Sequence, residues 1–291
     1  MIDSIVVPNS SYGSVKENIV NKQSTVLDIT HPGFHAKVSL FGGQVLSWQP
    51  QGQQPVLWCS DDSPLDGSKA IRGGIPVCWP WFGDFQGQGN HGFARNNTWL
   101  LQDVEYQPDH ITLVLSLSGQ QLSPVWPGSF TIEQRLRFAD TLTQTMTVTN
   151  NSQQQFSFTH ALHSYFSVSS PSNVRLPEVN LAWFDDKIIE VQGCKPQELK
   201  NIEGPVDRVY HLDKTVTLVD KGLKRIIEIS KFNSAQWIVW NPGEDLANTM
   251  TDIHDGGEQE FVCVEAGNTS WTKVDPGETV TFGQEIKVYN L

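Results

Sequence analysis

The chain has 291 residues, of which 38% are hydrophobic and 18% are charged, a balance typical of a globular protein with a sizeable core. Its 32 acidic and 20 basic side chains give a formal net charge of -12, which disfavours binding to nucleic acid or to an anionic membrane. Any bound anion must therefore be held by a local cluster of cations. Because the sequence lacks a run of about eighteen apolar residues and a signal-peptide pattern at residues 1–8, we expect a cytoplasmic location.

The sequence predicts one large domain. Residues 1–22 are polar and indicate an extended or poorly ordered arm, whereas residues 23–291 show no shift of composition that would mark a linker. The four cysteines lie far apart and include no CxxC pair. Two disulfides are conceivable, but a chain of this length needs no covalent staples, so we expect all four to be reduced packing residues. They are Cys59, Cys78, Cys194 and Cys263.

Alternating apolar and polar residues, rich in β-branched and aromatic side chains, predict strands along most of the chain. We expect them at residues 35–41, 44–48, 110–117, 130–138, 141–149, 187–191, 225–230, 236–240, 260–265 and 279–289. One short helix is expected at residues 241–250, with Asn241 as its cap and Pro242 in the first helical position. So many antiparallel strands require two packed sheets or a closed barrel, and we expect an all-β fold with a large antiparallel β-sandwich.

The first segment with chemical character is RGGIPVCWPWFG at residues 72–83, followed by HGFAR at residues 91–95. Arg72, His91 and Arg95 stand there among glycine, proline and aromatic residues, which form rigid turns and flat apolar walls. Such a combination favours a pocket for a small polar ligand, with the arginines as donors to its oxygens. Ordinary turns and packing are the alternative explanation.

The position along an expected strand distinguishes the two histidines within residues 156–165. If the segment is extended throughout, His160 shares the core face with Phe156 and Phe158, while His163 lies on the polar face that a ligand can reach. His160 is then a hydrogen-bonded histidine at the edge of the core. Because an HxxH spacing places the two rings on opposite sides of a strand, a shared zinc ion is disfavoured, and we expect no metal site.

Two acidic residues are further candidates. Glu265 follows four apolar residues at the expected end of a buried strand, where burial would raise the pKa of its carboxyl toward the range of a general base. An ordinary salt bridge at a strand end explains it equally well. Asp207 is expected on a loop within residues 204–210, where an acid after proline is common in turns.

Six motifs in order resemble those of one family. They are RGGIPVCWPWFG, HGFAR, ALHSYF around His163, VDRVY around Asp207, VWNP ending at Pro242 and VCVEAGN around Glu265. Together, from about His31 to the C-terminus, they resemble the D-hexose-6-phosphate mutarotases, also called glucose-6-phosphate 1-epimerases, of the aldose 1-epimerase superfamily. Residues before about position 22 match none of these motifs.

The resemblance implies a galactose mutarotase-like supersandwich and an enzyme without a cofactor that interconverts the α and β anomers of a hexose 6-phosphate. It implies that His163 is the general acid and Glu265 the general base. Residues similar to the family's substrate contacts are Arg72, His91, Arg95 and Asp207, and Gln44 resembles a further pocket position. A mutarotase of unphosphorylated aldoses and a non-catalytic carbohydrate-binding protein remain alternatives, and we expect a monomer or a weak homo-oligomer.

Overall fold

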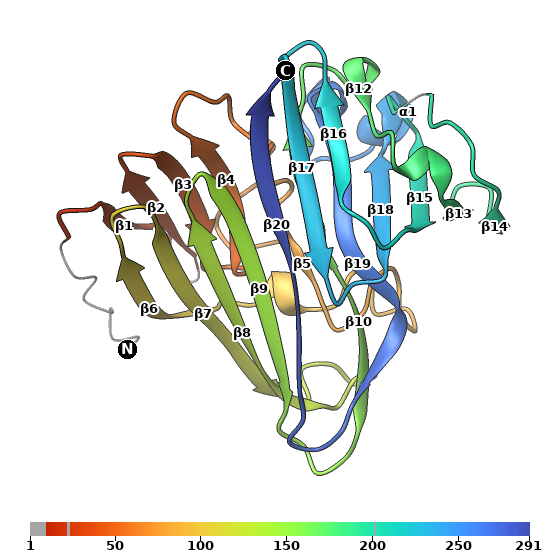
Figure 1. The fold of residues 1–291 in the computed structure, drawn as a ribbon. Coiled ribbons are helices and arrows are strands. Elements are labelled where there is room, and N and C mark those ends of the chain that lie inside the picture. The colour runs from red at the N-terminus through yellow and green to blue at the C-terminus, as the bar shows by residue number, and fades with distance from the viewer. Residues whose placement is uncertain (1–9, 22–23, 201) are drawn as a thin grey trace.

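The computed structural model describes residues 10–21, 24–200 and 202–291, which form two large antiparallel sheets and one small one (Figure 1). The small sheet has the order β1 (Ser14–Ile19), β2 (Thr25–His31), β3 (Phe34–Ser39) and β4 (Gln44–Pro50). Its first strand pairs with β2 along its whole length, so part of the predicted N-terminal arm is an edge strand. The rest of that arm, residues 1–9 and 22, lies outside the described residues.

The scaffold sheet has eight strands within the described residues. In order they are β12 (Val174–Arg175), β16 (Val216–Asp220), β17 (Arg225–Phe232), β20 (Thr279–Asn290), β9 (Thr141–Asn150), β8 (Ser129–Phe138), β7 (Ile111–Gln120) and β6 (Leu100–Tyr106). The sequence of β9 shows why it forms: Leu142, Met146 and Val148 alternate with threonines and are fully buried. A tight hairpin at residues 139–140 returns the chain from β8 to β9.

The cavity sheet also has eight strands in the described part of the chain. Its order is β14 (Val191–Cys194), β13 (Trp183–Asp186), β15 (Val206–His211), β18 (Gln236–Asn241), β19 (Phe261–Val274), β10 (Phe156–Leu162) and β5 (Val77–Cys78), and β11 (Tyr165–Ser167) also pairs with β19. The two large sheets enclose the main core, in which Met146 and Phe282 of the scaffold sheet meet Phe158 and Val264 of the cavity sheet. The all-β sandwich predicted from the strand pattern is confirmed.

Helices are short. The described residues contain α1 (Gly243–Ala247) and the 3-10 turns η1 (Ala94–Asn96), η2 (Pro171–Asn173), η3 (Val179–Leu181) and η4 (Gly257–Gln259). The helix predicted at residues 241–250 is therefore too long: Asn241 ends β18 and Pro242 is the N-cap, although the Asn241 side chain still accepts a hydrogen bond from the Gly243 amide (2.9 Å). None of the described helices is long and apolar enough to cross a membrane.

The strand predicted at residues 187–191 is wrong. Residues 187–190 form the turn between β13 and β14, because the Asp186 carboxylate accepts hydrogen bonds from the amides of Ile188 and Ile189 and so folds the backbone back on itself. Glu190 then adopts a left-handed conformation with φ of 55°. The β-branched run that suggested a strand is exposed at this turn. The four cysteines are free, as predicted.

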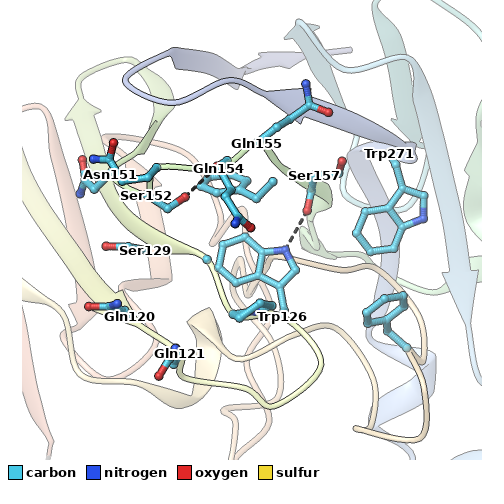
Figure 2. A pocket seen from close by; sticks show the side chains of 15 residues that line it. Gln120, Gln121, Trp126, Ser129, Asn151, Ser152, Gln154, Gln155, Ser157 and Trp271 are labelled. Atoms are coloured by element: carbon cyan, nitrogen blue, oxygen red, sulfur yellow. Dashed lines mark hydrogen bonds between the residues drawn. The ribbon is translucent and has the colours of Figure 1, made fainter.

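Two cavities of similar size open on this framework. One, of about 760 Å³, lies on the outer face of the cavity sheet, and the other, of about 750 Å³, is formed by the β7–β8 hairpin and the β9–β10 connection (Figure 2). They share no lining residue. Their side chains differ sharply in charge, and only the first contains the residues singled out in the sequence.

Candidate active site

The first cavity, which we call the catalytic cavity, owes its floor to the alternation of side chains along β19. Val262 and Val264 point into the core between the sheets, so Cys263 and Glu265 point to the opposite face. The sheet register sets Glu265 beside Ile238 of β18. Six of the seven predicted site residues line this cavity: Arg72, His91, Arg95, His163, Asp207 and Glu265.

His163 and Glu265 meet at the bottom of the catalytic cavity. The Nε2 atom of His163 lies 3.3 Å from Oε1 of Glu265, and the two side chains are 8% and 1% exposed. The sequence suggested that Glu265 ends a strand, which is wrong, because β19 continues for nine more residues. The Glu265 side chain is therefore buried within the sheet. His163 lies between β10 and β11, its amide donates to the Pro76 carbonyl (3.0 Å), and its ring stacks on Tyr165 (4.8 Å, 12°). Both side chains are therefore held in a buried, closely packed setting.

Burial also sets the protonation of this pair. Desolvation raises the pKa of the Glu265 carboxyl well above its ordinary value, and the Asp207 carboxylate raises it further. Desolvation lowers the pKa of His163 well below its ordinary value, reinforced by His91 and the arginines of the cavity. These effects favour a neutral imidazole and a protonated carboxyl. The two groups titrate as a coupled pair, because Nε2 and Oε1 are only 3.3 Å apart.

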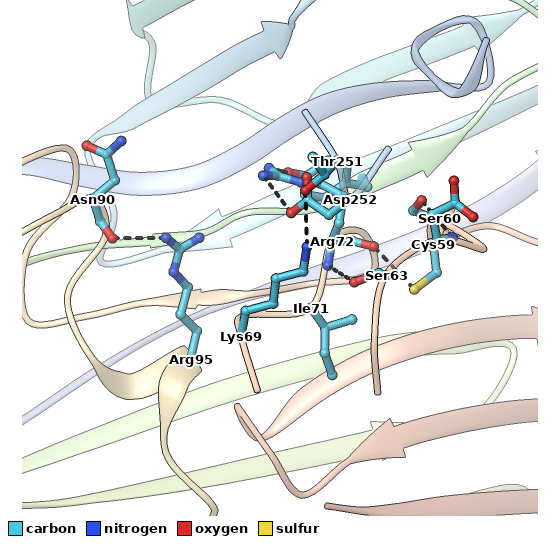
Figure 3. Close-up of polar contacts among 12 residues, drawn as sticks. Cys59, Ser60, Ser63, Lys69, Ile71, Arg72, Asn90, Arg95, Thr251 and Asp252 are labelled. Carbon is cyan, nitrogen blue, oxygen red and sulfur yellow. Dashed lines mark hydrogen bonds and ion pairs between the residues drawn. The ribbon is translucent and has the colours of Figure 1, made fainter. Parts of the chain in front are cut away.

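The loop that carries Arg72 is held closely against the strands (Figure 3). Its guanidinium donates to the Tyr165 hydroxyl (2.9 Å) and forms an ion pair with Asp252 (3.1 Å). Gly74, with φ of 61°, is needed because a Cβ there would overlap the Val45 carbonyl oxygen. The double glycine therefore lets the backbone pass close behind the cavity while the arginine faces into it.

His91 lies beside His163, with 5.7 Å between the ring centroids. Its backbone is left-handed (φ 70°), and its Nδ1 accepts a hydrogen bond from the Gly83 amide (3.2 Å), so the neutral ring carries its proton on Nε2. Desolvation, with help from Arg95 and Arg72, lowers the pKa of His91 to about 3. His91 is therefore a neutral hydrogen-bond donor near physiological pH.

Arg95 differs from Arg72 in its partners. Its guanidinium donates to the backbone carbonyl of Asn90 (2.9 Å), and within the described residues it forms no ion pair (Figure 3). The charge of Arg72, in contrast, is offset by Asp252. Arg95 thus brings into the cavity a positive charge that no ion pair holds, although it also acts on the nearby Glu265 carboxyl, and this suits it to an anionic group of a ligand.

Asp207 lies within β15 and not on a loop, so that part of the prediction is wrong. Its register partner in β18 is Trp240, two residues after the partner of Glu265, which brings the two carboxyls to the same face. Desolvation raises the pKa of Asp207, against the opposing effect of Lys187. A half-buried acid of this kind can accept hydrogen bonds from sugar hydroxyls.

Gln44 is placed differently from the prediction. It does not line the catalytic cavity; its side chain is fully buried, and Nε2 donates to the carbonyls of Ile71 (3.2 Å) and Gly73 (2.7 Å). The prediction of a pocket position is therefore wrong in its geometry. Gln44 supports the backbone on both sides of Arg72 from behind.

The histidine assignment drawn from strand alternation agrees with the geometry at His160 but not along the whole segment. His160 Nε2 is 2.9 Å from the Ser234 hydroxyl, and its ring stacks on Phe282 in the core (3.6 Å). However, β10 ends at Leu162 and its register with β19 shifts after Phe158, so the segment is not extended throughout. The face expected to be polar is itself buried.

Several lining residues escaped the sequence reasoning. Lys187 and Trp240 line the cavity, and Tyr165 and Asp252 hold Arg72. Tyr165 could have been found, since it follows His163 by two residues in the same motif. Asp252 lies in a turn after α1 that shows no distinctive pattern. In the described ranges, no three His, Cys, Asp or Glu side chains are grouped as metal ligands would be.

Comparison with known proteins agrees with the fold and the motifs. The model of a family described as "Aldose 1-epimerase" matches residues 25–287. A protein of Escherichia coli strain K12 named "Putative glucose-6-phosphate 1-epimerase" is 33% identical over 265 residues, which are 89% of each chain. A Salmonella typhimurium crystal structure described as "a putative mutarotase" has a TM-score of 0.88 at 30% identity and covers 98% of this chain and 97% of that one. Galactose 1-epimerase from Lactobacillus acidophilus, with a TM-score of 0.72 at 13% identity, shares the fold.

Proposed function

Because the chain belongs to the aldose 1-epimerase family, we propose that it interconverts the α and β anomers of a hexose 6-phosphate, with glucose 6-phosphate as its substrate. The observation that carries the proposal is the contact of 3.3 Å between His163 and Glu265 in a cavity that also contains Arg72 and Arg95. The first pair suits proton transfer at a hemiacetal. The two arginines suit a phosphate.

The chemistry needs one acid and one base. Glu265 accepts the proton of the C1 hydroxyl while His163 donates a proton to the ring oxygen, so the bond from C1 to O5 breaks and an aldehyde forms. Rotation about the C1–C2 bond presents the other carbonyl face to the O5 hydroxyl. Reversal of both proton transfers closes the ring as the other anomer and restores both side chains. His91, a neutral donor, would orient a hydroxyl beside them.

Substrate binding would set the pair in its working state. Arg72 and Arg95 contribute to the low pKa of His163 in the empty cavity. A phosphate dianion against these guanidinium groups would offset their charge and so favour the imidazolium over the neutral ring. The single proton of the pair would then move from Glu265 to His163, which leaves a carboxylate as base and an imidazolium as acid. Binding of a phosphorylated sugar would therefore favour the protonation states that catalysis needs, a carboxylate at Glu265 and an imidazolium at His163.

Two further properties belong to the proposal. We propose a monomer or a weak homo-oligomer, since the cavity of a single chain already contains His163, Glu265 and both arginines. A sugar phosphate carries charge that opposes its passage through a bilayer, so we propose that the enzyme acts in the cytoplasm.

The test is the rate of anomerisation of freshly dissolved α anomers, followed by polarimetry or NMR. We expect kcat/KM for glucose 6-phosphate to exceed that for free glucose by about tenfold or more, since hydrogen bonds to a charged group are strong. Equal turnover of glucose and galactose would overturn the phosphate assignment. Binding of sugar phosphate without any acceleration would overturn catalysis and leave a carbohydrate-binding protein.

A further inference from the structure

The second cavity, which we call the amide cavity, is as large as the catalytic one but differs from it in chemistry. Its volume is about 750 Å³, within the range of small-molecule sites. None of its lining residues is Asp, Glu, Lys, Arg or His, whereas the catalytic cavity is lined by all five types. A charged ligand would find no counter-charge there, which excludes a second phosphate site.

Side-chain amides dominate the lining of the amide cavity. They come from two separate segments, the end of the β7–β8 hairpin and the β9–β10 connection (Figure 2): Gln120, Gln121, Asn151, Gln153, Gln154 and Gln155. An amide both donates and accepts hydrogen bonds, as does a hydroxyl such as that of Ser129 or Ser157. This matches a ligand whose own groups both donate and accept, namely the hydroxyls of a sugar.

Most of these amides are available to a ligand. In the described part of the chain, the side chains of Gln120, Gln121, Gln153 and Gln154 form no hydrogen bond with other residues. Asn151 and Gln155 are bound to Thr131 and Asp275. Four amides from two facing segments therefore point donors and acceptors at solvent around one cavity.

Aromatic rings supply the apolar surface. Trp126 is 4% exposed, and its indole nitrogen donates to the Ser157 carbonyl (2.7 Å), so the ring is fixed (Figure 2). Trp271 is 45% exposed, and its ring lies 4.9 Å from that of Phe85. A flat exposed ring packs against the C–H face of a pyranose while the amides bind its edge hydroxyls.

The backbone around the cavity does not favour a peptide. An extended peptide binds by adding a strand to a free sheet edge. Here β8 lies between β7 and β9. On the side of β10 away from β19, β5 pairs only with Ala161 and Leu162, but the Ser157 carbonyl accepts from the Trp126 indole and the Thr159 amide donates to the Pro80 carbonyl, which leaves little free edge for an added strand. We infer that the amide cavity binds a neutral saccharide, with Trp271 as stacking platform and Gln154 among its hydrogen-bonding groups.

The experiment titrates the full-length protein with methyl α-maltotrioside and methyl β-cellotrioside, which have no free anomeric hydroxyl and cannot be opened at C1. Binding is followed by saturation-transfer NMR and tryptophan fluorescence. We expect a Kd on the order of 1 mM for at least one probe, and at least ~10-fold weaker binding in Trp271→Ala and in Gln154→Ala. Trp183→Ala, which removes an indole of similar exposure (50%) outside this cavity, should bind as the wild type does.

All three variants should keep mutarotation of glucose 6-phosphate within about twofold, because none touches the reacting groups. Failure of both probes to bind would overturn the inference. Binding that survives in Trp271→Ala but is lost in Arg95→Gln would also overturn it, because the saccharide would then lie in the catalytic cavity. The titration does not depend on catalysis, so failure of the proposed function would leave its result unchanged.

Discussion

The two halves of the catalytic cavity are built in different ways. The loop half, residues 72–95, turns on glycines with positive φ and presents Arg72, His91 and Arg95, whose hydrogen bonds go to loop atoms or to neighbouring polar side chains. The strand half presents His163 and Glu265, almost fully buried and fixed by β10, β11 and β19. Polar loops suit recognition of a variable substrate, whereas buried strands suit groups that need shifted pKa values. Substitutions in the loop half should therefore change substrate preference, whereas substitutions in the strand half should change kcat.

The strand half should give the largest effect. Glu265→Gln keeps the shape of the side chain but removes the proposed base, and His163→Asn removes the proposed acid, so each should lower kcat by about 10²–10⁴-fold with little change in KM. Circular dichroism should show an intact fold. Glu133→Gln and His35→Asn, at half-exposed or exposed positions outside the cavity, are the matched controls. Wild-type kcat in either catalytic variant would remove the proposed mechanism.

The loop half should act on substrate choice. Arg95→Gln removes a guanidinium that forms no ion pair within the described residues, and we expect a fall of about 10–100-fold in kcat/KM for glucose 6-phosphate, because hydrogen bonds to charged groups contribute strongly. Turnover of free glucose should change little, and Arg95→Lys should recover part of the loss. Arg175→Gln, an exposed arginine bound to its own backbone region, is the control. Equal losses for both sugars would place Arg95 outside phosphate recognition.

The sequence could predict those parts of the fold in which one chemical pattern dominates. In β9 threonines alternate with Leu142, Met146 and Val148, and the buried face follows from this alternation, although Gln144 and Asn150 also lie on it. At residues 187–191 the same kind of pattern failed, because one carboxylate, that of Asp186, captures two backbone amides and makes a turn. A hydrogen bond of this kind depends on local geometry that periodicity does not contain.

The candidate site was predictable where its motifs lie on contiguous residues. His163 could be singled out by its place along an expected strand and Glu265 because it follows an apolar run, but their distance of 3.3 Å depends on the pairing of β10 and β11 with β19. Gln44 and Asp252 show which contacts of the site could not be predicted from the sequence. A buried amide behind a loop and a carboxylate in a distant turn both act on the Arg72 segment through tertiary contacts, which no spacing in the sequence records.

Two glycines of the loop half should differ in how much stability is lost when a side chain is added. Gly92 has φ of 66°, and a Cβ there would overlap the Trp79 carbonyl, whereas Gly87 has φ of 70° and open space around it. Gly87→Ala should therefore cost only the left-handed strain, about 1–2 kcal/mol, and Gly92→Ala distinctly more. Urea denaturation measures both. Equal losses of unfolding free energy in the two variants would mean that the contact with Trp79 relaxes freely and that the loop is not closely fitted at Gly92.

The smallest effect we predict is that of pH near neutrality. The proposed mechanism needs one proton on the pair of His163 and Glu265. Below the lowered pKa of His163 the pair takes up a second proton, and Glu265 can no longer act as a base. Above the raised pKa of Glu265 the pair loses its only proton, and His163 can no longer act as an acid. The kcat/KM for free glucose, which lacks a titrating phosphate, should thus vary by less than about twofold through neutral pH, with its acid limb below the ordinary histidine pKa of about 6.5. NMR of the histidine rings, with His163→Asn for assignment, checks the same point directly. Titration of His163 near 6.5 in the ligand-free protein would mean that water reaches this ring freely, and the burial that distinguishes the strand half would not shift the pKa of its histidine.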